Sequence, residues 1–328
     1  MRVIHGSSSY PETAPPLALG IGNFDGVHRG HRALLERLHL LAARRAVPAA
    51  VLTFRPHPAQ LLRPEQAPPL LCDPEDERAL LAEAGVQLLI EEPFVPELAR
   101  LSPEQFVKQV LLGRLHACRL VVGFSFHFGA RAAGTAETLQ QLGAGLGIEV
   151  EIVPAITQQG VAISSSRIRA AVGEGRLEEA TELLGHPFRL SGTVVHGEGR
   201  GRQLGFPTIN LARSTPLLPR HGVYAARALL HRDDRVVAAA VSIGVRPTFG
   251  EKPLAIEAHL VEFEGDLYGQ RVSLDLLRFL RPERRFAGVE ELTAALREDL
   301  ALTRQLLGAA SEAPATGALQ LALRRAGR

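Results

Sequence analysis

An apolar run and a turn rich in glycine and histidine lie near the start of the chain, where residues 17–31 read LALGIGNFDGVHRGH. Leu17 to Ile21 have the length and composition of a short buried strand, and the residues after His31 predict a helix that continues to about Arg45. A strand, a turn and a helix in this order are typical of open α/β sheets, in which ligands bind beyond the carboxyl ends of the strands. This stretch therefore predicts both a fold and a binding site.

Two histidines mark the start of that helix. His28 and His31 are three residues apart, so both side chains can face the same side of the first helical turn. A helix N-terminus with nearby glycines offers backbone N–H groups to phosphate. Two imidazoles there could bind phosphate oxygens and stabilise charge that develops on an α-phosphate during in-line attack. The alternative is a pair of surface histidines at an ordinary helix start.

Short apolar strands alternate with amphipathic helices through the first half of the chain. This alternation predicts a mostly parallel sheet covered by helices, a Rossmann-like α/β fold. A further helix is expected after Ser102, which can form a capping box with Gln105. The expected strands are residues 17–21, 49–54, 86–90, 119–123 and 148–153.

The pattern changes after Gly185-His186-Pro187 to closely spaced strands. This spacing predicts a small antiparallel β-barrel, and apolar residues at helical spacing over 289–307 predict one helix that closes it. We therefore expect one domain over residues 1–185, a second over 186–308, and a flexible tail over 309–328. The expected barrel strands are residues 192–196, 222–230, 235–243, 256–262 and 270–280.

The composition is that of a globular protein with two domains: 328 residues, 46% hydrophobic and 22% charged, with a net charge of +2. The basic residues are scattered arginines with only two lysines, which argues against a nucleic-acid partner. Two cysteines are too few for a disulfide framework, and no apolar run is long enough to span a bilayer. We expect a cytoplasmic protein without a membrane partner. The sequence carries no signal for or against self-association.

Three further unusual segments follow other expected strands, at residues 53–58, 123–129 and 163–169. The carboxyl ends of parallel strands share one edge of a sheet, so these segments should gather at the edge that carries the histidines. The serines at 164–166 head a helix, where they and Arg167 would form a second phosphate cradle; the alternative is an ordinary serine N-cap. The phenylalanines of the second segment are equally consistent with a buried core.

These segments resemble the adenylyltransferase half of bacterial bifunctional riboflavin kinase/FAD synthetases, within the nucleotidyltransferases that share a His-x-Gly-His signature. The resemblance implies that FMN is adenylated to FAD, with His28 and His31 as catalytic residues at the ATP phosphates. It implies that ATP is bound by Gly22, Asn23, Phe24, Asp25, Gly30, Ser164, Ser165, Ser166 and Arg167, the last four gripping the departing pyrophosphate. It implies that the flavin lies near His57, Ser125 and Phe128.

Two positions depart from this family pattern. Arg55 stands where relatives usually carry an acidic residue before Pro-His-Pro, and Ser125 stands where Asp or Asn is usual. Arg55 reverses a charge beside the expected phosphates. One interpretation is that Arg55 binds the FMN phosphate, and the other is that it weakens the placement of Mg²⁺.

A second glycine-rich stretch lies at residues 192–210, which read GTVVHGEGRGRQLGFPTIN. No helix is expected after these glycines, which argues against a dinucleotide-binding fingerprint; a flap over phosphates and a flexible barrel loop remain. The stretch resembles riboflavin kinases. The resemblance implies that Thr208 and Asn210 hold Mg²⁺, whose preferred ligands are oxygens. It implies that ATP is bound by Gly197, Gly199, Gly201, Arg202, Gly205, Pro207, Thr208 and Asn210.

Phosphorylating riboflavin requires a base that takes the proton of a primary alcohol as it attacks the γ-phosphate. Glu257 is the candidate, since the resemblance places its strand beside the flavin ribityl chain; an exposed strand glutamate is the alternative. Arg281 and Arg285 lie near the expected closing helix and could assist binding there, but we interpret both as solvated surface arginines.

Three other functions are consistent with parts of the sequence. If Arg55 and Ser125 disable the first site, the protein is a riboflavin kinase only. A class I aminoacyl-tRNA-synthetase-like enzyme would also carry a His-x-Gly-His-like signature, but the near-neutral charge and the two isolated lysines argue against it. A flavin carrier without catalysis would need neither phosphate cradle.

Overall fold

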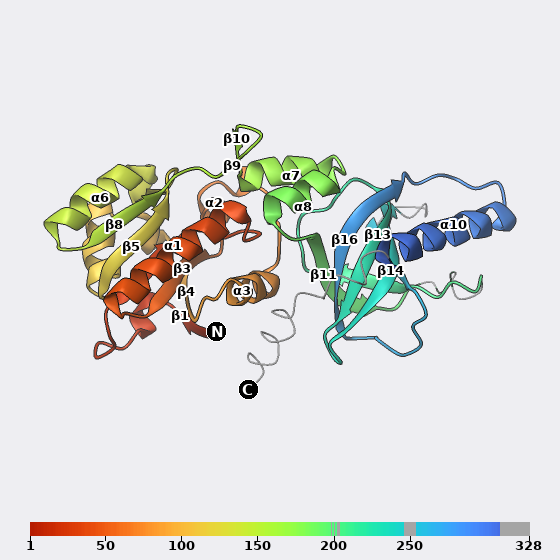
Figure 1. Cartoon of the computed structure of the whole chain (residues 1–328), viewed down its shortest axis with the longest axis horizontal. Coiled ribbons are helices and arrows are strands. Elements are labelled where there is room, and N and C mark those ends of the chain that lie inside the picture. The colour runs from red at the N-terminus through yellow and green to blue at the C-terminus, as the bar shows by residue number, and fades with distance from the viewer. Residues whose placement is uncertain (198, 200, 202–203, 246–253, 309–328) are drawn as a thin grey trace. The chain divides into compact units, whose positions relative to one another are not determined.

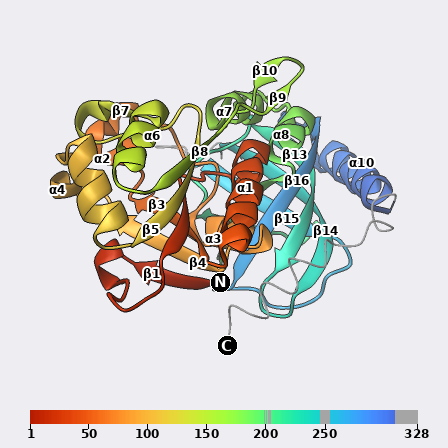
Figure 2. The same cartoon turned by 60° about the vertical axis from the view of Figure 1, so that its left-hand side comes forward.

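The computed structural model describes residues 1–197, 199, 201, 204–245 and 254–308. The chain forms two compact units, whose elements are drawn in Figure 1 and Figure 2. Among the described residues, the first unit comprises Met1–Pro68 and Glu77–Ile163, and the second comprises Pro69–Asp76 and the residues from Ser164 onward. The domain limits expected at residues 185 and 308 stay a prediction.

A six-stranded sheet forms the centre of the first unit, in the order β1-β4-β3-β2-β5-β8, and all of its strand pairs are parallel. Strand order reverses at β2, which pairs with β3 on one side and with β5 on the other. This is the switch point of a Rossmann-like sheet, so the predicted fold class is confirmed. The strands are β1 (Arg2–His5), β2 (Leu17–Ile21), β3 (Ala49–Arg55), β4 (Leu88–Pro93), β5 (Ala117–Gly123) and β8 (Glu149–Val153).

Helices cover both faces of this sheet because strand side chains alternate between the faces. Leu19 of β2 lies in one hydrophobic cluster and Ala18 in the other. Leu139 of α6 packs in the first cluster and Leu35 of α1 in the second. The longer helices are α1 (Arg29–Arg45), α3 (Pro74–Glu83), the π-helical η3 (Phe106–Leu112) and α6 (Ala136–Gly145).

Short elements fill the connections of the first unit. The expected capping box is present, because Ser102 accepts from the Gln105 N–H and the Gln105 side chain accepts from the Ser102 N–H. The short elements are η1 (Ser7–Ser9), α2 (Pro58–Leu62), η2 (Pro64–Gln66), α4 (Pro96–Ala99), α5 (Pro103–Gln105), β6 (His127–Phe128), η4 (Ala130–Ala132), β7 (Gly134–Thr135), β9 (Thr157–Gln158) and β10 (Val161–Ala162).

A closed barrel forms the centre of the second unit, in the order β11-β12-β15-β14-β13-β16, and its strand pairs are antiparallel. The helix α10 packs on β13 and β14, so the predicted barrel with a closing helix is confirmed. The elements are α7 (Ser165–Gly173), α8 (Leu177–Leu184), β11 (Phe188–Val195), β12 (Ile209–Arg213), β13 (Gly222–Leu230), β14 (Arg235–Val245), β15 (Leu254–Leu260), β16 (Arg271–Arg281) and α10 (Val289–Gly308).

The sequence pattern does not predict β1 or β12. Each contains a single buried residue, Ile4 in β1 and Leu211 in β12, so neither strand carries an apolar alternation strong enough to identify it. Both strands form because a neighbouring strand offers its backbone for pairing: β4 pairs with β1, and β11 and β15 pair with β12.

The interpretation of Arg281 as a solvated surface arginine is wrong. Its Nε donates to Asp299 Oδ1 at 2.9 Å, and its Nη2 donates to Oδ2 at 2.7 Å. Asp299 lies on α10 and is only 2% exposed. A bidentate pair with a buried carboxylate therefore fastens the closing helix to the end of β16.

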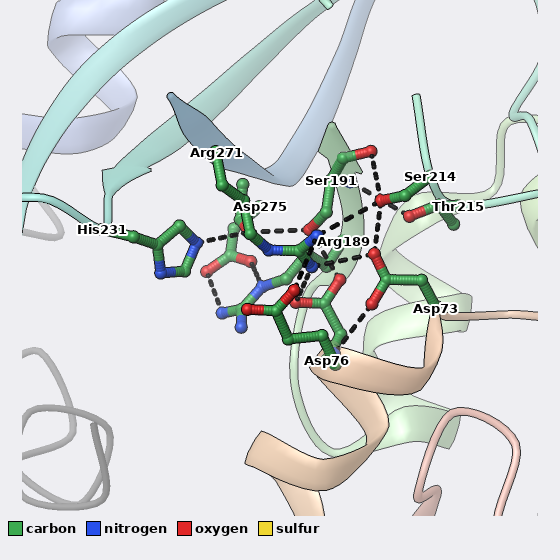
Figure 3. Close-up of polar contacts among 11 residues, drawn as sticks. Asp73, Asp76, Arg189, Ser191, Ser214, Thr215, His231, Arg271 and Asp275 are labelled. Carbon is green, nitrogen blue, oxygen red and sulfur yellow. Dashed lines mark hydrogen bonds and ion pairs between the residues drawn. The ribbon is translucent and has the colours of Figure 1, made fainter. Parts of the chain in front are cut away.

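A buried polar network holds the segment Pro69–Asp76 against the barrel strands (Figure 3). The hydroxyl of Ser191 on β11 donates to Asp76 Oδ2 at 2.6 Å. Arg271 on β16 lies between two carboxylates, with its Nη2 2.8 Å from Asp73 Oδ2 and 3.2 Å from Asp76 Oδ1. The Ser214 hydroxyl also donates to Asp73. Arg271 is therefore a cation that both aspartates share.

Burial and the neighbouring arginines shift the pKa values of these aspartates in opposite directions. Burial raises the pKa of Asp76, and the neighbouring charge of Asp73 raises it further, whereas Arg189 and Arg271 oppose both effects. Burial alone would raise the pKa of Asp73 too, but hydrogen bonds from the Asp76 N–H, Ser214 and Arg271 hold it below its usual value. The segment stays bound because its buried charges are paired.

We expect Arg271→Ala to lower the free energy of unfolding by about 3 kcal/mol, because two buried carboxylates lose their shared cation. Arg278→Ala on the same strand is the matched control: Arg278 is 59% exposed and lies 3.9 Å from the exposed Glu178, so its loss should change stability by less than about 0.5 kcal/mol. Urea denaturation measures both variants. Equal losses would contradict the role given to Arg271.

Candidate functional site

The first candidate site lies at the switch point of the parallel sheet. Gly20 of β2 pairs with Val121 of β5, so the segments that follow these two strands leave the same edge side by side. In an open α/β sheet this crevice at the carboxyl ends of the strands is where ligands bind. The strand order brings the expected segments after β2, β3 and β5 to this edge, whereas residues 163–169 follow β10, which pairs with β9 in a separate two-stranded sheet.

The turn after β2 has an unusual backbone. Phe24, Gly26 and Val27 have φ angles of 49°, 77° and 39°, a left-handed conformation that is rare for a bulky or β-branched residue. The side chains of Phe24 and Val27 are fully buried in the core, and this packing holds the conformation. Asp25 lies between them and is only 3% exposed. The turn thus presents a buried carboxyl group at the sheet edge.

The two signature histidines form a stacked pair at the start of α1. Their ring centroids are 3.6 Å apart and the ring planes differ by 13°. His28 is the N-cap, and its Nδ1 accepts from the His31 N–H at 3.3 Å, which puts the proton of the neutral His28 ring on Nε2. A Cβ on Gly30 would lie 3.1 Å from the His28 ring. Glycine at this position therefore leaves room for the imidazole.

His31 remains neutral near pH 7. Burial lowers its pKa well below the usual 6.5, and the adjacent His28 lowers it further. Its Nδ1 is buried and has no hydrogen-bond partner among the described residues. Buried polar atoms in proteins are nearly always paired, so an orphaned imidazole nitrogen at a helix N-terminus is suited to a phosphate oxygen.

The segments after β2 and β3 are in contact. His57 Nε2 lies 3.1 Å from Asn23 Nδ2, and His57 Nδ1 accepts from the Ala59 N–H to cap α2. The Thr53 hydroxyl donates to the Asn23 carbonyl at 3.4 Å. The structure therefore joins one residue predicted at the nucleotide to one predicted at the flavin.

In the segment after β5, Ser125 lies on the surface and Phe128 lies in the core. Ser125 is exposed, and its carbonyl lies 2.8 Å from His127 Nδ1. Phe128 is only 7% exposed and packs against Phe126 and Phe106, with centroid distances of 5.5 and 5.8 Å. Phe128 is thus a core residue. The flavin-binding roles of Ser125 and Phe128 stay predictions.

The serine triplet lies in the second unit, at the start of α7. Ser164 is the N-cap and accepts from the Arg167 N–H at 3.3 Å, as an ordinary serine cap does. Arg167 Nη2 lies 3.2 Å from Glu179 Oε1 on α8, so its guanidinium is fixed by an ion pair. Ser165 and Ser166 occupy the first turn. The pyrophosphate-binding role of these residues stays a prediction.

The second candidate site lies on the barrel. Asn210 on β12 pairs directly with Glu257 on β15, so their side chains share one face and their Cβ atoms are about 5 Å apart. That face is partly exposed, whereas Ile256 and Ala258 on either side of Glu257 are buried. Thr208 precedes β12 by one residue and is also partly exposed. Register alone places a predicted metal ligand opposite the predicted base.

The glycine-rich segment approaches these residues closely. A Cβ on Gly197 would overlap the Asn210 side chain, and a Cβ on Gly201 would lie 3.3 Å from Thr208 Oγ1. Gly199 and Gly205 have φ angles of 70° and 82°. Only glycine permits these approaches and conformations without strain. Arg202, predicted to bind phosphate, lies outside the described residues.

Two contacts near the barrel site were not singled out by sequence reasoning. His259 Nδ1 lies 2.8 Å from the Pro207 carbonyl, which ties the loop before β12 to β15. His196 stacks on Tyr268 with a centroid distance of 3.8 Å, and Tyr268 is 44% exposed. His196 directly precedes Gly197. No spacing in the sequence identifies either pair, because each joins residues far apart in the chain.

Two family models match the chain in sequence order. The model described as FAD synthetase matches residues 10–167, and the model described as riboflavin kinase matches residues 184–307. The Escherichia coli K12 protein named "Bifunctional riboflavin kinase/FMN adenylyltransferase" is 37% identical over 308 residues, which cover 94% of this chain and 97% of that protein. The chain belongs to this bifunctional enzyme family. The resemblance in both halves of the sequence is thereby confirmed.

Another protein named bifunctional riboflavin kinase/FMN adenylyltransferase also matches over most of its length. The Bacillus subtilis protein of the same name is 34% identical over 305 residues, covering 91% of this chain and 95% of the relative. A crystal structure described as a macrolide-efflux protein from Streptococcus pneumoniae has a TM-score of 0.82 and 30% identity, covering 92% of this chain and 98% of that one. The activity in that description, efflux, is given for the pneumococcal protein and not for this chain.

Family membership argues against an aminoacyl-tRNA-synthetase-like enzyme and against a flavin carrier without catalysis, since both halves of the chain match families of flavin-synthesising enzymes. Among the residues that the structure describes, none of the helices combines the length and the apolar character that a membrane span requires.

His28→Asn should raise the pKa of His31, because the charge of His28 is one of its two causes of lowering. Burial is the larger cause and should still keep this pKa below 6.5. Titration of the imidazole signals by NMR measures this shift. His196→Asn, in the second unit, should leave the titration of His31 unchanged. A His31 that protonates at or above pH 6.5 in the unmodified protein would contradict the environment described.

Proposed function

We propose that this chain phosphorylates riboflavin to FMN at the barrel and adenylates FMN to FAD at the parallel sheet, with ATP as the donor in both reactions. One observation supports the proposal: a single chain of the bifunctional family has, in two separate units, a set of groups whose chemistry suits phosphate. The stacked His28 and His31 head a helix in one unit, and Asn210 faces Glu257 beside close-packed glycines in the other. Each set suits one of the two transfers.

In the kinase reaction, Glu257 takes the proton of the terminal riboflavin hydroxyl as its oxygen attacks the γ-phosphorus of ATP. Thr208 and Asn210 offer oxygen ligands of the kind that Mg²⁺ prefers, on the face that carries Glu257, so this donor set fits the ion. When bound there, Mg²⁺ would neutralise charge on the phosphates. The backbone N–H groups of Gly197 and Gly199 approach the phosphates from the other side.

In the adenylyltransferase reaction, a phosphate oxygen of FMN attacks the α-phosphorus of ATP and pyrophosphate leaves. His28 and His31 donate hydrogen bonds to the phosphate oxygens, and a neutral His31 does so without adding a positive charge. Asn23 lies beside the nucleotide and His57 toward the flavin. We assign the departing pyrophosphate to the hydroxyl groups at 164–166 and to the Arg167 guanidinium.

The ligands of both reactions are small molecules: riboflavin, FMN, FAD and ATP. We place these reactions in the cytoplasm, where Cys72 and Cys118 would stay reduced; neither forms a disulfide with another described residue.

Incubation with riboflavin, ATP and Mg²⁺, followed by chromatography of the products, tests the proposal directly. We expect FMN to form first and FAD to follow. FMN without FAD would support the alternative of a riboflavin kinase with an inactive adenylyltransferase site. Formation of neither product would refute both. Omitting Mg²⁺ and adding a chelator should abolish FMN formation, because the donor set at Thr208 and Asn210 would then be without its ion.

Two variants assign the two sites. Glu257→Gln should lower the kcat of FMN formation by about 10²–10⁴-fold, because the shape is kept and the base is lost. His31→Ala should lower FAD formation from supplied FMN by about 10²-fold, because one hydrogen-bond donor to the developing charge is removed. Each variant should keep the other activity, which serves as its folding control. Normal turnover in either variant would contradict the role of that residue.

Gly197→Ala tests the close approach of the glycine segment. The added Cβ would overlap the Asn210 side chain, so we expect FMN formation to fall by about tenfold or more while FAD formation from supplied FMN is kept. Gly288→Ala is the matched control, since a Cβ there meets nothing within 4 Å. Equal activity of the two variants would contradict the packing of Gly197 against Asn210.

A further inference from the structure

Arg55 is the residue whose charge departs from the family pattern, and the structure places it among carboxylates. It ends β3, two residues before His57. Its Nη2 lies 2.5 Å from Glu77 Oε1 on α3, and its Nε lies 3.8 Å from Glu91 Oε1 on β4. The side chains of Glu77 and Glu91 are each 4% exposed, and that of Arg55 is 20% exposed. The Nε atom of the guanidinium is itself buried and has no hydrogen-bond partner among the described residues, so Glu77 provides the hydrogen bond that fixes this side chain.

Glu77 is the carboxylate that depends most on Arg55. Glu91 is held by a second cation, because Arg78 donates to both of its oxygens at 2.9 and 2.7 Å. Asp25, in the turn after β2, is close enough to Glu77 for its charge to act on it. The strongest electrostatic interactions of Glu77 are therefore with one cation, Arg55, and with two negative groups, Asp25 and Glu91.

Burial makes the charges of this pair interdependent. Burial raises the pKa of Glu77 to about 7, Arg55 opposes the shift, and Asp25 and Glu91 add to it. An arginine buried without a carboxylate, or a carboxylate buried without a cation, is strongly unfavourable. Arg55 thus has its counter-charge within the protein. Neither earlier interpretation, a ligand of the FMN phosphate or a disturbance of Mg²⁺, is needed to account for it.

The pair is linked to the candidate adenylyltransferase site through the backbone and the turn. The Arg55 carbonyl accepts from the Phe94 N–H at 2.8 Å, which anchors the end of β3. His57 follows and lies 3.1 Å from Asn23, in the turn that also carries Asp25. A displaced Arg55 would therefore move His57, and an unpaired Glu77 would change the electrostatic field at Asp25.

We propose that Arg55 and Glu77 form a compensated charge pair, in which Glu77 acts as a positioning residue that neutralises Arg55 and fixes the end of β3, two residues before His57. This inference rests on the proposed FAD synthesis and adds a residue to it. Ionised Glu77 keeps the guanidinium on the protein side of the site. The unusual arginine is then compatible with an active adenylyltransferase.

Charge reversal tests the pair in the full-length protein, with FAD formation from supplied FMN and ATP as the readout. Arg55→Glu and Glu77→Lys should each lower kcat/KM for FMN by about tenfold or more, since each places like charges together in a buried site. The double variant R55E/E77K restores one charge of each sign, so its activity should return to within about threefold of the unmodified protein. FMN formation from riboflavin, measured on the same samples, should stay unchanged and reports folding of the chain.

Arg37 and Glu151 provide a matched control. They form an Arg–Glu pair of the same length, 2.5 Å, but with side chains 40% and 26% exposed. Arg37→Glu should change FAD formation by less than about twofold, because water can solvate both partners. If R55E and E77K impair activity and the double variant fails to recover it while FMN formation is kept, the compensated pair is refuted. Unimpaired single variants refute it too. If the unmodified protein makes no FAD, the proposed function fails instead.

The pH dependence separates positioning from stability. Because the pKa of Glu77 is about 7, the ion pair is complete above that pH and is lost as pH falls, so FAD formation should rise between pH 6 and 8 relative to Glu77→Gln. The stability of the fold changes in the opposite direction. Because folding raises the pKa of the Glu77 carboxyl, the contribution of this group to the free energy of unfolding falls as pH rises from about 4.5 to 7. Activity of the unmodified protein that falls over pH 6–8 relative to Glu77→Gln would overturn the positioning role.

Discussion

The pairing of β2 with β3 on one side and with β5 on the other is the constraint from which the first site follows. Parallel strands bring their carboxyl ends to one edge, so segments distant in sequence meet there. The left-handed turn at Phe24 and Val27 is held because both side chains are fully buried in the core. Core packing thus maintains a backbone conformation that places Asp25 and the stacked histidines at the edge.

In the barrel, strand register brings together site residues that are distant in the sequence. Antiparallel pairing of β12 with β15 puts Asn210 opposite Glu257, and the neighbouring residues of β15 fill the interior. The glycine segment completes the arrangement because its backbone comes close enough to Asn210 and Thr208 that a Cβ would meet them. Both units therefore bring glycine backbone close to polar side chains, one at a helix start and one in a loop.

Buried charge recurs in both units and follows one rule. Arg271 is shared by Asp73 and Asp76, and Arg55 is bound by Glu77. In each case desolvation would make an isolated charge unfavourable, so the cation and its carboxylates are retained together. In the second unit such a network fastens a segment of the chain to the barrel. In the first unit the pair lies next to residues of the candidate site.

The sequence by itself determined the fold class of both halves, the family, and the location of the motifs, because strand alternation, helix caps and glycine turns are local patterns. It did not reveal β1 and β12, which form only because neighbouring strands pair with them. It also left open what Arg55 does. Only the tertiary structure brought Glu77 to that arginine from 22 residues away, stacked His28 on His31 and buried Phe128. The physical reason is that pairing and desolvation depend on which distant groups surround a side chain, and no local pattern encodes them.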